Sequence, residues 1–147
     1  AIGPEWVALM NLSEEIRRTG EHSKIIRQGY DLDWPVQDRD YVLLEEAIFD
    51  QDNRVFTLNF RSVEDPEVPV VDDYIRAEAI TTYWRLSQIP DSDFVRVEVE
   101  VFTDPRGTLP PWLINFIQRT WPRDTIAGLY RRSAQGDIAS HPETRGW

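Results

Sequence analysis

The sequence of 147 residues contains no cysteine and only two histidines. Without cysteine there are no disulfides, thiolate nucleophiles or Cys-based metal sites, and the composition fits the reducing cytoplasm, where we expect this protein. His22 and His141 fall in a predicted turn and a predicted tail, and no HExxH, Ser-His-Asp or Gly-rich phosphate motif accompanies them. We therefore predict no catalytic residue, no metal and no cofactor.

Long apolar runs and an excess of basic charge are missing as well. No stretch of about 18 apolar residues and no charged-then-apolar leader occurs, so the sequence predicts neither a membrane span nor a signal peptide. Acidic residues number 26 against 16 basic ones, which gives a net charge of -10. This charge repels nucleic-acid phosphates, so we exclude nucleic acid as a partner. It also disfavours permanent docking on an anionic membrane and leaves transient contact open.

Aromatic residues, in contrast, are plentiful, with six tryptophans and an aromatic share of 12%. Disordered acidic tails lack such side chains, so this chain should fold. Its length suits one domain that buries roughly two-thirds of the surface exposed by the unfolded chain. We expect that domain over residues 1–134 and a loosely held polar tail over residues 135–147.

The spacing of apolar residues predicts the elements in the first two-thirds of the chain. Approximate helical spacing predicts a short helix over Glu5–Arg18. Alternation and β-propensity indicate strands over His22–Leu32, Tyr41–Asp50, Arg54–Val63 and Tyr74–Gln88, the last of them central in the sheet. The polar Gln51–Asn53 between the second and third of these strands suits a tight reversal, so we expect the two to form a hairpin.

The clearest alternation is that of the valines in Val95–Val101, which indicates a strand buried on one side only. After a turn at Asp104–Gly107, prolines in the first turn begin a helix whose apolar stripe covers Leu109–Trp121. Pro122 should kink or break this helix, and a second piece continues over Ile126–Arg132.

Strands followed by a helix, without βαβ alternation, indicate the α+β class. We expect a curved antiparallel sheet of about five strands covered by a long C-terminal helix, with a pocket between them if they do not pack tightly. The candidate ligand-binding residues of this pocket are Arg76, Tyr83, Val97, Val99, Trp112, Leu113, Phe116 and Ile117.

Several of these residues have a second interpretation. Arg76 either faces the cavity, where it needs a ligand head group or a carboxylate as partner, or points outward. Each aromatic side chain is equally suited to filling a core. Glu98 and Glu100 share a face opposite the valines, which favours a solvated surface over an acid–base pair.

Three segments resemble the family of StAR-related lipid-transfer (START) domains. Trp34–Val42 is similar to the family's WP-x-x-x-RD-[FY]-V segment, Ile75–Ala77 follows in the family's order, and Asp104–Asn115 resembles the DP-x-G-x-LP-x-W-hydrophobic-x-N start of its lid helix. The resemblance covers roughly Trp6–Tyr130. It implies a helix-grip fold that encloses one sterol, phospholipid or similar molecule, with Leu109–Tyr130 as the lid.

The sequence departs from the family pattern at two places. The family fold usually begins with a helix and about three further strands, which have no counterpart before Trp6. The partial sheet would have an open edge, which invites pairing with another copy of the chain. Some START domains also carry an Arg six residues beyond the Arg of the RD motif, where this sequence has Glu45, so we transfer no polar ligand contact to that position.

Together these features predict a protein that binds one hydrophobic lipid-like molecule, which enters by opening of the lid helix, and they leave its transfer open. Two alternatives stay open: an enzyme of the aromatase/cyclase or hydrolase type within the wider helix-grip superfamily, and an interaction module with a filled core. A cavity that holds a His, Tyr or carboxylate with a perturbed pKa would favour the enzyme.

Overall fold

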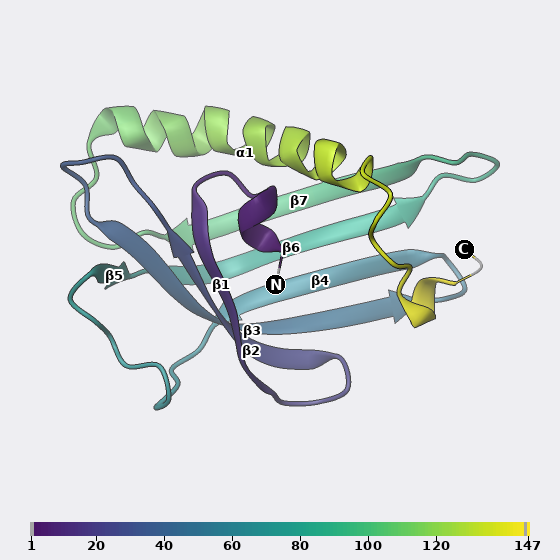
Figure 1. The fold of residues 1–147 in the computed structure, drawn as a ribbon, viewed down its shortest axis with the longest axis horizontal. Helices are drawn as coiled ribbons and strands as arrows, with labels where there is room; N and C mark the ends of the chain where they lie inside the picture. The colour runs from purple at the N-terminus through teal and green to yellow at the C-terminus, as the bar shows by residue number, and fades with distance from the viewer. Residues whose placement is uncertain (1, 146) are drawn as a thin grey trace.

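The computed structural model describes residues 2–145 and 147, and over these residues the chain forms seven strands and one long helix (Figure 1). The fold is therefore α+β, as the sequence predicted, with more strands than the five expected. The elements are η1 (Gly3–Glu5), β1 (Met10–Arg18), β2 (Ser23–Tyr30), β3 (Asp38–Asp50), β4 (Val55–Ser62), β5 (Tyr74–Arg76), β6 (Glu78–Gln88), β7 (Val95–Asp104), α1 (Pro111–Ser133) and η2 (Pro142–Thr144). None of the described helices combines the length and hydropathy that a membrane span needs.

The strands form one sheet in the order β1-β2-β3-β4-β6-β7, and β5 pairs with β3 off this path. Neighbours along the path are antiparallel, whereas β5 is parallel to β3. The predicted hairpin is confirmed as β3 and β4. Its turn is stabilised by the Asp50 carboxylate, which accepts hydrogen bonds from the backbone N–H of Asn53 at 3.1 Å and from its side-chain amide at 2.8 Å.

The strand register sorts the side chains onto two faces. Directly opposed residues of antiparallel strands share a face, so Trp84 lies on the same face as its partners Leu58 and Val99. We call this the inner face, and the face that carries Tyr83 and Val42 the outer face.

Each face has a buried apolar cluster. The inner cluster consists of Ile26, Leu43 and Ala79, with Tyr41 and Phe60 packed against it. The outer cluster consists of Ile25, Val42 and Val68, with Ile16, Leu44 and Val63 packed against it. Because Val63 and Val68 belong to the connection between β4 and β5, that loop covers the outer face and leaves α1 to cover the inner one.

The helix predicted over Glu5–Arg18 is wrong, because the chain forms only the short η1 and then β1. The register of β1 against β2 shifts between Met10 and Leu12 and again between Glu15 and Arg17. Each irregularity adds a residue to the strand, so its apolar positions no longer alternate strictly. The resulting spacing resembles that of a helix.

The strand predicted over Tyr74–Gln88 is divided into β5 and β6, and β6 lies inside the sheet between β4 and β7. The register of β6 against β7 also shifts, between Ala79 and Thr81. Simple alternation would place Ala79 on the face of Tyr83, but the shift moves it to the inner cluster.

The C-terminal helix does not end at Pro122, since α1 is one element of 23 residues with this proline inside it. Pro122 lacks the N–H that would bond the carbonyl of Gln118. Both residues are exposed, so water can satisfy that carbonyl. Figure 1 shows α1 returning along β7 toward the end of the sheet where β6 and β7 are joined.

Candidate functional site

The turn between β7 and α1 is held to the sheet by Arg39, the first residue of the RD motif. Arg39 is only 3% exposed, and its guanidinium donates to the carbonyls of Pro105 and Arg106 at 3.1 Å each. Arg106 and Gly107 have φ angles of 53° and 67°, which bend the chain sharply before the helix. An Arg fork suits such clustered carbonyl oxygens, and it fixes the start of α1.

Asp40, the second residue of the motif, lies on the outer face and is 1% exposed. It accepts two hydrogen bonds from Arg76, at 2.8 and 3.1 Å, and one from Arg27 at 2.8 Å. Arg76 also donates to the carbonyl of Val68 in the loop that covers this face. The carboxylate that Arg76 needs is therefore supplied by the protein, away from the inner face.

The second half of α1 is held by the segment that precedes β1. The indole of Trp121 donates to the carbonyl of Ala8 at 2.9 Å, and the N–H of Ala8 donates to the hydroxyl of Thr125 at 3.2 Å. One turn later, a Cβ on Gly128 would lie 2.1 Å from the carbonyl oxygen of Trp6. Only glycine allows this approach of helix and segment.

Arg132 adds an ionic contact at the end of α1, on the side of the helix that carries Trp121, Thr125 and Gly128. It is 9% exposed, donates to Glu5 at 2.7 Å and also pairs with Asp137 just after the helix. Its hydrogen bonds with Asp137 and Glu5 raise the pKa of Arg132, and the bond from Arg132 lowers the pKa of Asp137. The end of α1 is thus tied to both the N-terminal segment and the C-terminal tail.

The side chain of Trp6 connects the N-terminal segment to the sheet. Its ring meets that of Trp84 edge to face, with centroids 5.4 Å apart and an interplanar angle of 89°. Figure 1 shows the N-terminal segment beside the middle of α1. The second half of the helix therefore rests on Trp6, which in turn rests on the inner face at Trp84.

The structure brings five of the predicted site residues to the facing surfaces of sheet and helix. Val97 and Val99 are half-buried on the inner face, because they oppose Leu86 and Trp84 in the register of β6 and β7. On α1, Leu113 is 2% exposed, and Ile117 and Phe116 are half-buried one turn further on.

The other three predicted residues lie elsewhere. Trp112 precedes Leu113 by one residue and so points about 100° away around the helix, where it is 50% exposed. Tyr83 lies on the outer face with its partner Glu100. Arg76 belongs to the Asp40 cluster described above.

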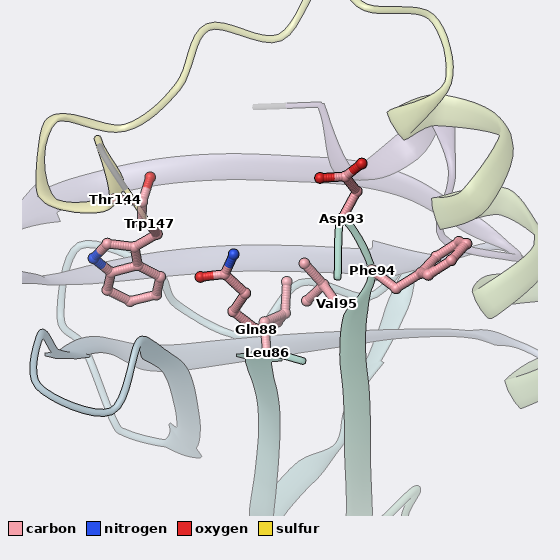
Figure 2. A pocket seen from close by; sticks show the side chains of 7 residues that line it. All are labelled: Leu86, Gln88, Asp93, Phe94, Val95, Thr144 and Trp147. Atoms are coloured by element: carbon pink, nitrogen blue, oxygen red, sulfur yellow. The ribbon is translucent and has the colours of Figure 1, made fainter. Parts of the chain in front are cut away.

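A pocket of about 350 Å³ lies where the C-terminal tail crosses the ends of β6 and β7 (Figure 2). It is lined by Leu86, Gln88, Asp93, Phe94, Val95, Thr144 and Trp147. The indole of Trp147 donates to the side chain of Gln51 at 2.7 Å, which fixes the tail against the β3–β4 turn. In Figure 2 the ring of Trp147 lies across the pocket from Asp93, whereas the ring of Phe94 points away from Trp147.

The sequence did not predict this pocket, because the pocket depends on the C-terminal tail. The polar composition of that tail predicted only a loose attachment. The one signal in the sequence is the presence of aromatic residues, Phe94 and Trp147, in segments that are otherwise polar. Nothing in the sequence of these two segments indicates that they line the same pocket, because their contact depends on how the tail folds back.

The inner face also carries two phenols. The rings of Tyr30 and Tyr41 meet edge to face with centroids 5.7 Å apart. Burial raises the pKa of both hydroxyls, which therefore stay protonated at neutral pH and can donate a hydrogen bond but not accept a proton as a base. Within the described residues, no group of three or more acidic or histidine side chains is arranged to hold a metal ion.

Comparison with known proteins gives a likeness of structure rather than of sequence. No family model and no curated protein matches the chain. Among solved structures, human STARD10 matches with a TM-score of 0.73 and 21% identity over 92% of this chain, and human StAR-related lipid transfer protein 5 with 0.75 and 20% over 91%. The STAR-related lipid transfer protein from Xanthomonas axonopodis matches with 0.72 and 23% over 89%.

This chain spans 57% and 64% of the two human chains and 71% of the bacterial one. Because 89–92% of this chain is aligned, most of its sheet and of its C-terminal helix fall within the match. The chain therefore has the fold of a StAR-related lipid-transfer domain, a START-like fold of the helix-grip type.

Proposed function

We propose that this chain binds one hydrophobic, lipid-like molecule between α1 and the inner face of the sheet. The observation that supports this most strongly is incomplete burial. Ile117 and Trp121 on the helix and Trp84 on the sheet are all only half-buried, although α1 is fastened at both of its ends. In a filled core such side chains would be almost fully buried. Apolar side chains left half-buried between fixed elements offer surface that a hydrophobic ligand could cover.

The proposed ligand contacts are the five predicted residues that lie on the facing surfaces of the sheet and α1. They are Val97, Val99, Leu113, Phe116 and Ile117. Affinity would come mainly from buried apolar area, at about 25 cal/mol per Å². Solved structures of the same fold include proteins described as lipid transfer proteins, which supports extending the proposal from binding to transfer.

We propose a binding protein rather than an enzyme of the cyclase or hydrolase type. The buried carboxylate of Asp40 is on the outer face, where Arg27 and Arg76 neutralise it. The buried Arg39 on the inner side is bound by the carbonyls of Pro105 and Arg106. The inner face also carries the protonated phenols of Tyr30 and Tyr41. A protonated phenol can orient a polar ligand group by donating a hydrogen bond.

Transfer also requires contact with a membrane, for which Trp34 is the best candidate. Its side chain is 92% exposed in the connection between β2 and β3. An exposed indole is well suited to the interface between lipid and water. We propose that this contact is transient, because the net charge of -10 opposes permanent binding to anionic lipid.

The edge of β7 offers a further partner. Among the described residues β7 pairs only with β6, so its other edge presents unpaired backbone groups. Val101 and Phe102 in this strand are 43% and 58% exposed. Such an edge can pair with another copy of the chain. Sedimentation analysis over a range of concentrations would detect this association.

The proposal is tested by two neighbouring substitutions with the same change of charge. Ile117→Asp places a carboxylate among the proposed ligand contacts, so uptake of a fluorescent fatty acid should fall at least tenfold. Gln118→Asp changes an exposed residue of the same turn and should retain uptake. Circular dichroism checks that both variants fold. Equal uptake by folded Ile117→Asp and Gln118→Asp would contradict the proposed site.

A further inference from the structure

We propose that β7 pairs antiparallel with β7 of a second copy of this chain, in the register that places Glu98 on the twofold axis. Each chain then offers the same edge to the other, which is the arrangement of a symmetric dimer. The inference rests on the part of the proposed function that gives this edge a second copy as its partner. It adds which residues meet across the interface, and it does not depend on lipid binding.

The free edge of β7 is long and regular. Among the described residues this strand of ten residues is hydrogen-bonded to β6 alone, and it is the last strand of the sheet (Figure 1). Its register against β6 is unbroken from Val95 to Phe102, and the strand contains no proline. Bulges and prolines are common protections of an exposed edge, and this stretch has neither. The remaining protection is charge, so the register decides whether the edge repels a second copy.

Sheet geometry leaves few registers for such a pair. Directly opposed residues point to the same face, so the twofold axis passes through a residue rather than between two residues. An axis at Val99 places Glu98 opposite Glu100 at two positions, where like charges repel. An axis at Glu98 instead places Arg96 opposite Glu100 of the second copy at two positions, where opposite charges attract.

The exposed apolar side chains select the same register. They are Phe94, Val95, Val101 and Phe102, which are 74%, 52%, 43% and 58% exposed. With the axis at Glu98, Val95 lies opposite Val101 of the second copy, and Phe94 lies opposite Phe102. An axis at Val97 leaves Val101 and Phe102 outside the paired residues, and an axis at Glu100 leaves Phe94 and Val95 outside them. Only the axis at Glu98 brings all four side chains against apolar partners.

This register has one unfavourable contact, because the two Glu98 carboxylates meet on the axis. Each of them also has Arg85 of its own chain as its cross-strand partner on β6. Across the axis the outer face therefore carries the row Arg85, Glu98, Glu98 and Arg85. Each carboxylate has one neighbour of opposite charge and one of like charge, so removal of the like pair should strengthen the dimer.

The test exchanges charges across the interface and measures the dimer dissociation constant by sedimentation over a range of concentrations. The unmodified chain should dimerise reversibly. Arg96→Glu places like charges at both symmetric positions and should weaken the dimer about tenfold or more. Combining Arg96→Glu with Glu100→Arg restores both opposite-charge pairs and should recover the original constant. Glu98→Gln removes the like pair on the axis and should tighten the dimer.

The matched control combines Arg96→Glu with Glu98→Arg, which carries the same net charge as the rescuing pair. It leaves Glu opposite Glu100 and should not restore the dimer. All these side chains lie on the outer face, as the pairing of Glu100 with Tyr83 shows, away from the proposed ligand contacts. Uptake of a fluorescent fatty acid should therefore be equal in every variant, and circular dichroism checks that each one folds.

Dimerisation that is unaffected by Arg96→Glu, or not recovered when Glu100→Arg is added, would overturn the proposed register. Recovery in the control variant instead would place the axis at Val97 and overturn it as well. A chain that stays monomeric at every concentration would contradict both the register and the second copy as partner. Failure to take up any fatty acid by a chain that still dimerises would count against lipid binding alone.

Discussion

Arg39 and Asp40 are adjacent in sequence but act on opposite sides of the sheet, because neighbouring residues of a strand point to opposite faces. The arginine fixes the turn that begins α1, and the aspartate neutralises two arginines under the outer loop. The sequence marked this pair only as part of a motif shared with the family. It could not predict the partners, which are distant in the chain.

Asp40→Asn should be among the most destabilising single changes. It removes the charge that Arg27 and Arg76 share and leaves both guanidinium groups near a neutral amide. Breaking a buried ion pair in this way costs about 3–5 kcal/mol. Urea unfolding measures the loss, with Asp52→Asn in the exposed β3–β4 turn as the control. A difference below about 1 kcal/mol between the two variants would contradict the role given to Asp40.

Gly128→Ala tests the close approach of α1 to the N-terminal segment. Alanine is intrinsically the better helix former, by about 1 kcal/mol. Here its Cβ would meet the carbonyl of Trp6 at 2.1 Å, so the helix must move outward and the variant should lose about 1–3 kcal/mol of unfolding free energy. Increased stability on thermal unfolding would show that helix and segment are not packed as described.

At the scale of elements, the sequence was most informative where its pattern was regular. The valine alternation predicted β7, and the polar Gln51–Asn53 reversal predicted the β3–β4 hairpin. The prediction was wrong over β1, because two register shifts give this strand an apolar spacing like that of a helix. It was also incomplete at β5, which pairs with β3 instead of continuing into β6. Such shifts depend on the partner strand, so they cannot be read from one segment alone.

The residues of the candidate site were also predicted best where the sequence pattern was regular. The apolar stripe of α1 predicted that Leu113 and Ile117 face the sheet, and in the structure Leu113 is buried and Ile117 half-buried, because helical periodicity is local. Trp112 and Tyr83 were chosen for being aromatic rather than for their phase, and they lie outside the facing surfaces. Trp6 was assigned to a helix, so its position between α1 and Trp84 was not foreseen.

The inner-face tyrosines predict a loss of stability at alkaline pH. Burial raises the folded-state pKa of Tyr30 and Tyr41 above the ordinary value of 10.0. A raised pKa means that this stability is fully present below about pH 10 and is lost as the pH rises through the folded-state value. Replacing both residues by Phe should flatten the decline in unfolding free energy above pH 10. An unchanged slope in urea unfolding would contradict their burial.

At the scale of the whole molecule, the sheet has two differently covered faces. The outer face is closed by a loop and a neutralised charge cluster, whereas the inner face is covered by a helix fastened at its two ends. Between those fastenings, large apolar side chains from helix and sheet face each other while only half-buried. A helix anchored in this way can cover a ligand without collapsing onto the strands.

Native mass spectrometry of the chain, incubated with a mixture of fatty acids and then freed of unbound lipid, tests this account most directly. We predict a folded protein that carries one fatty-acid molecule per chain, and Ile117→Asp at the unliganded mass. A folded chain that retains no apolar molecule under any of these conditions would show that the space beneath α1 is closed by protein, and would contradict the account.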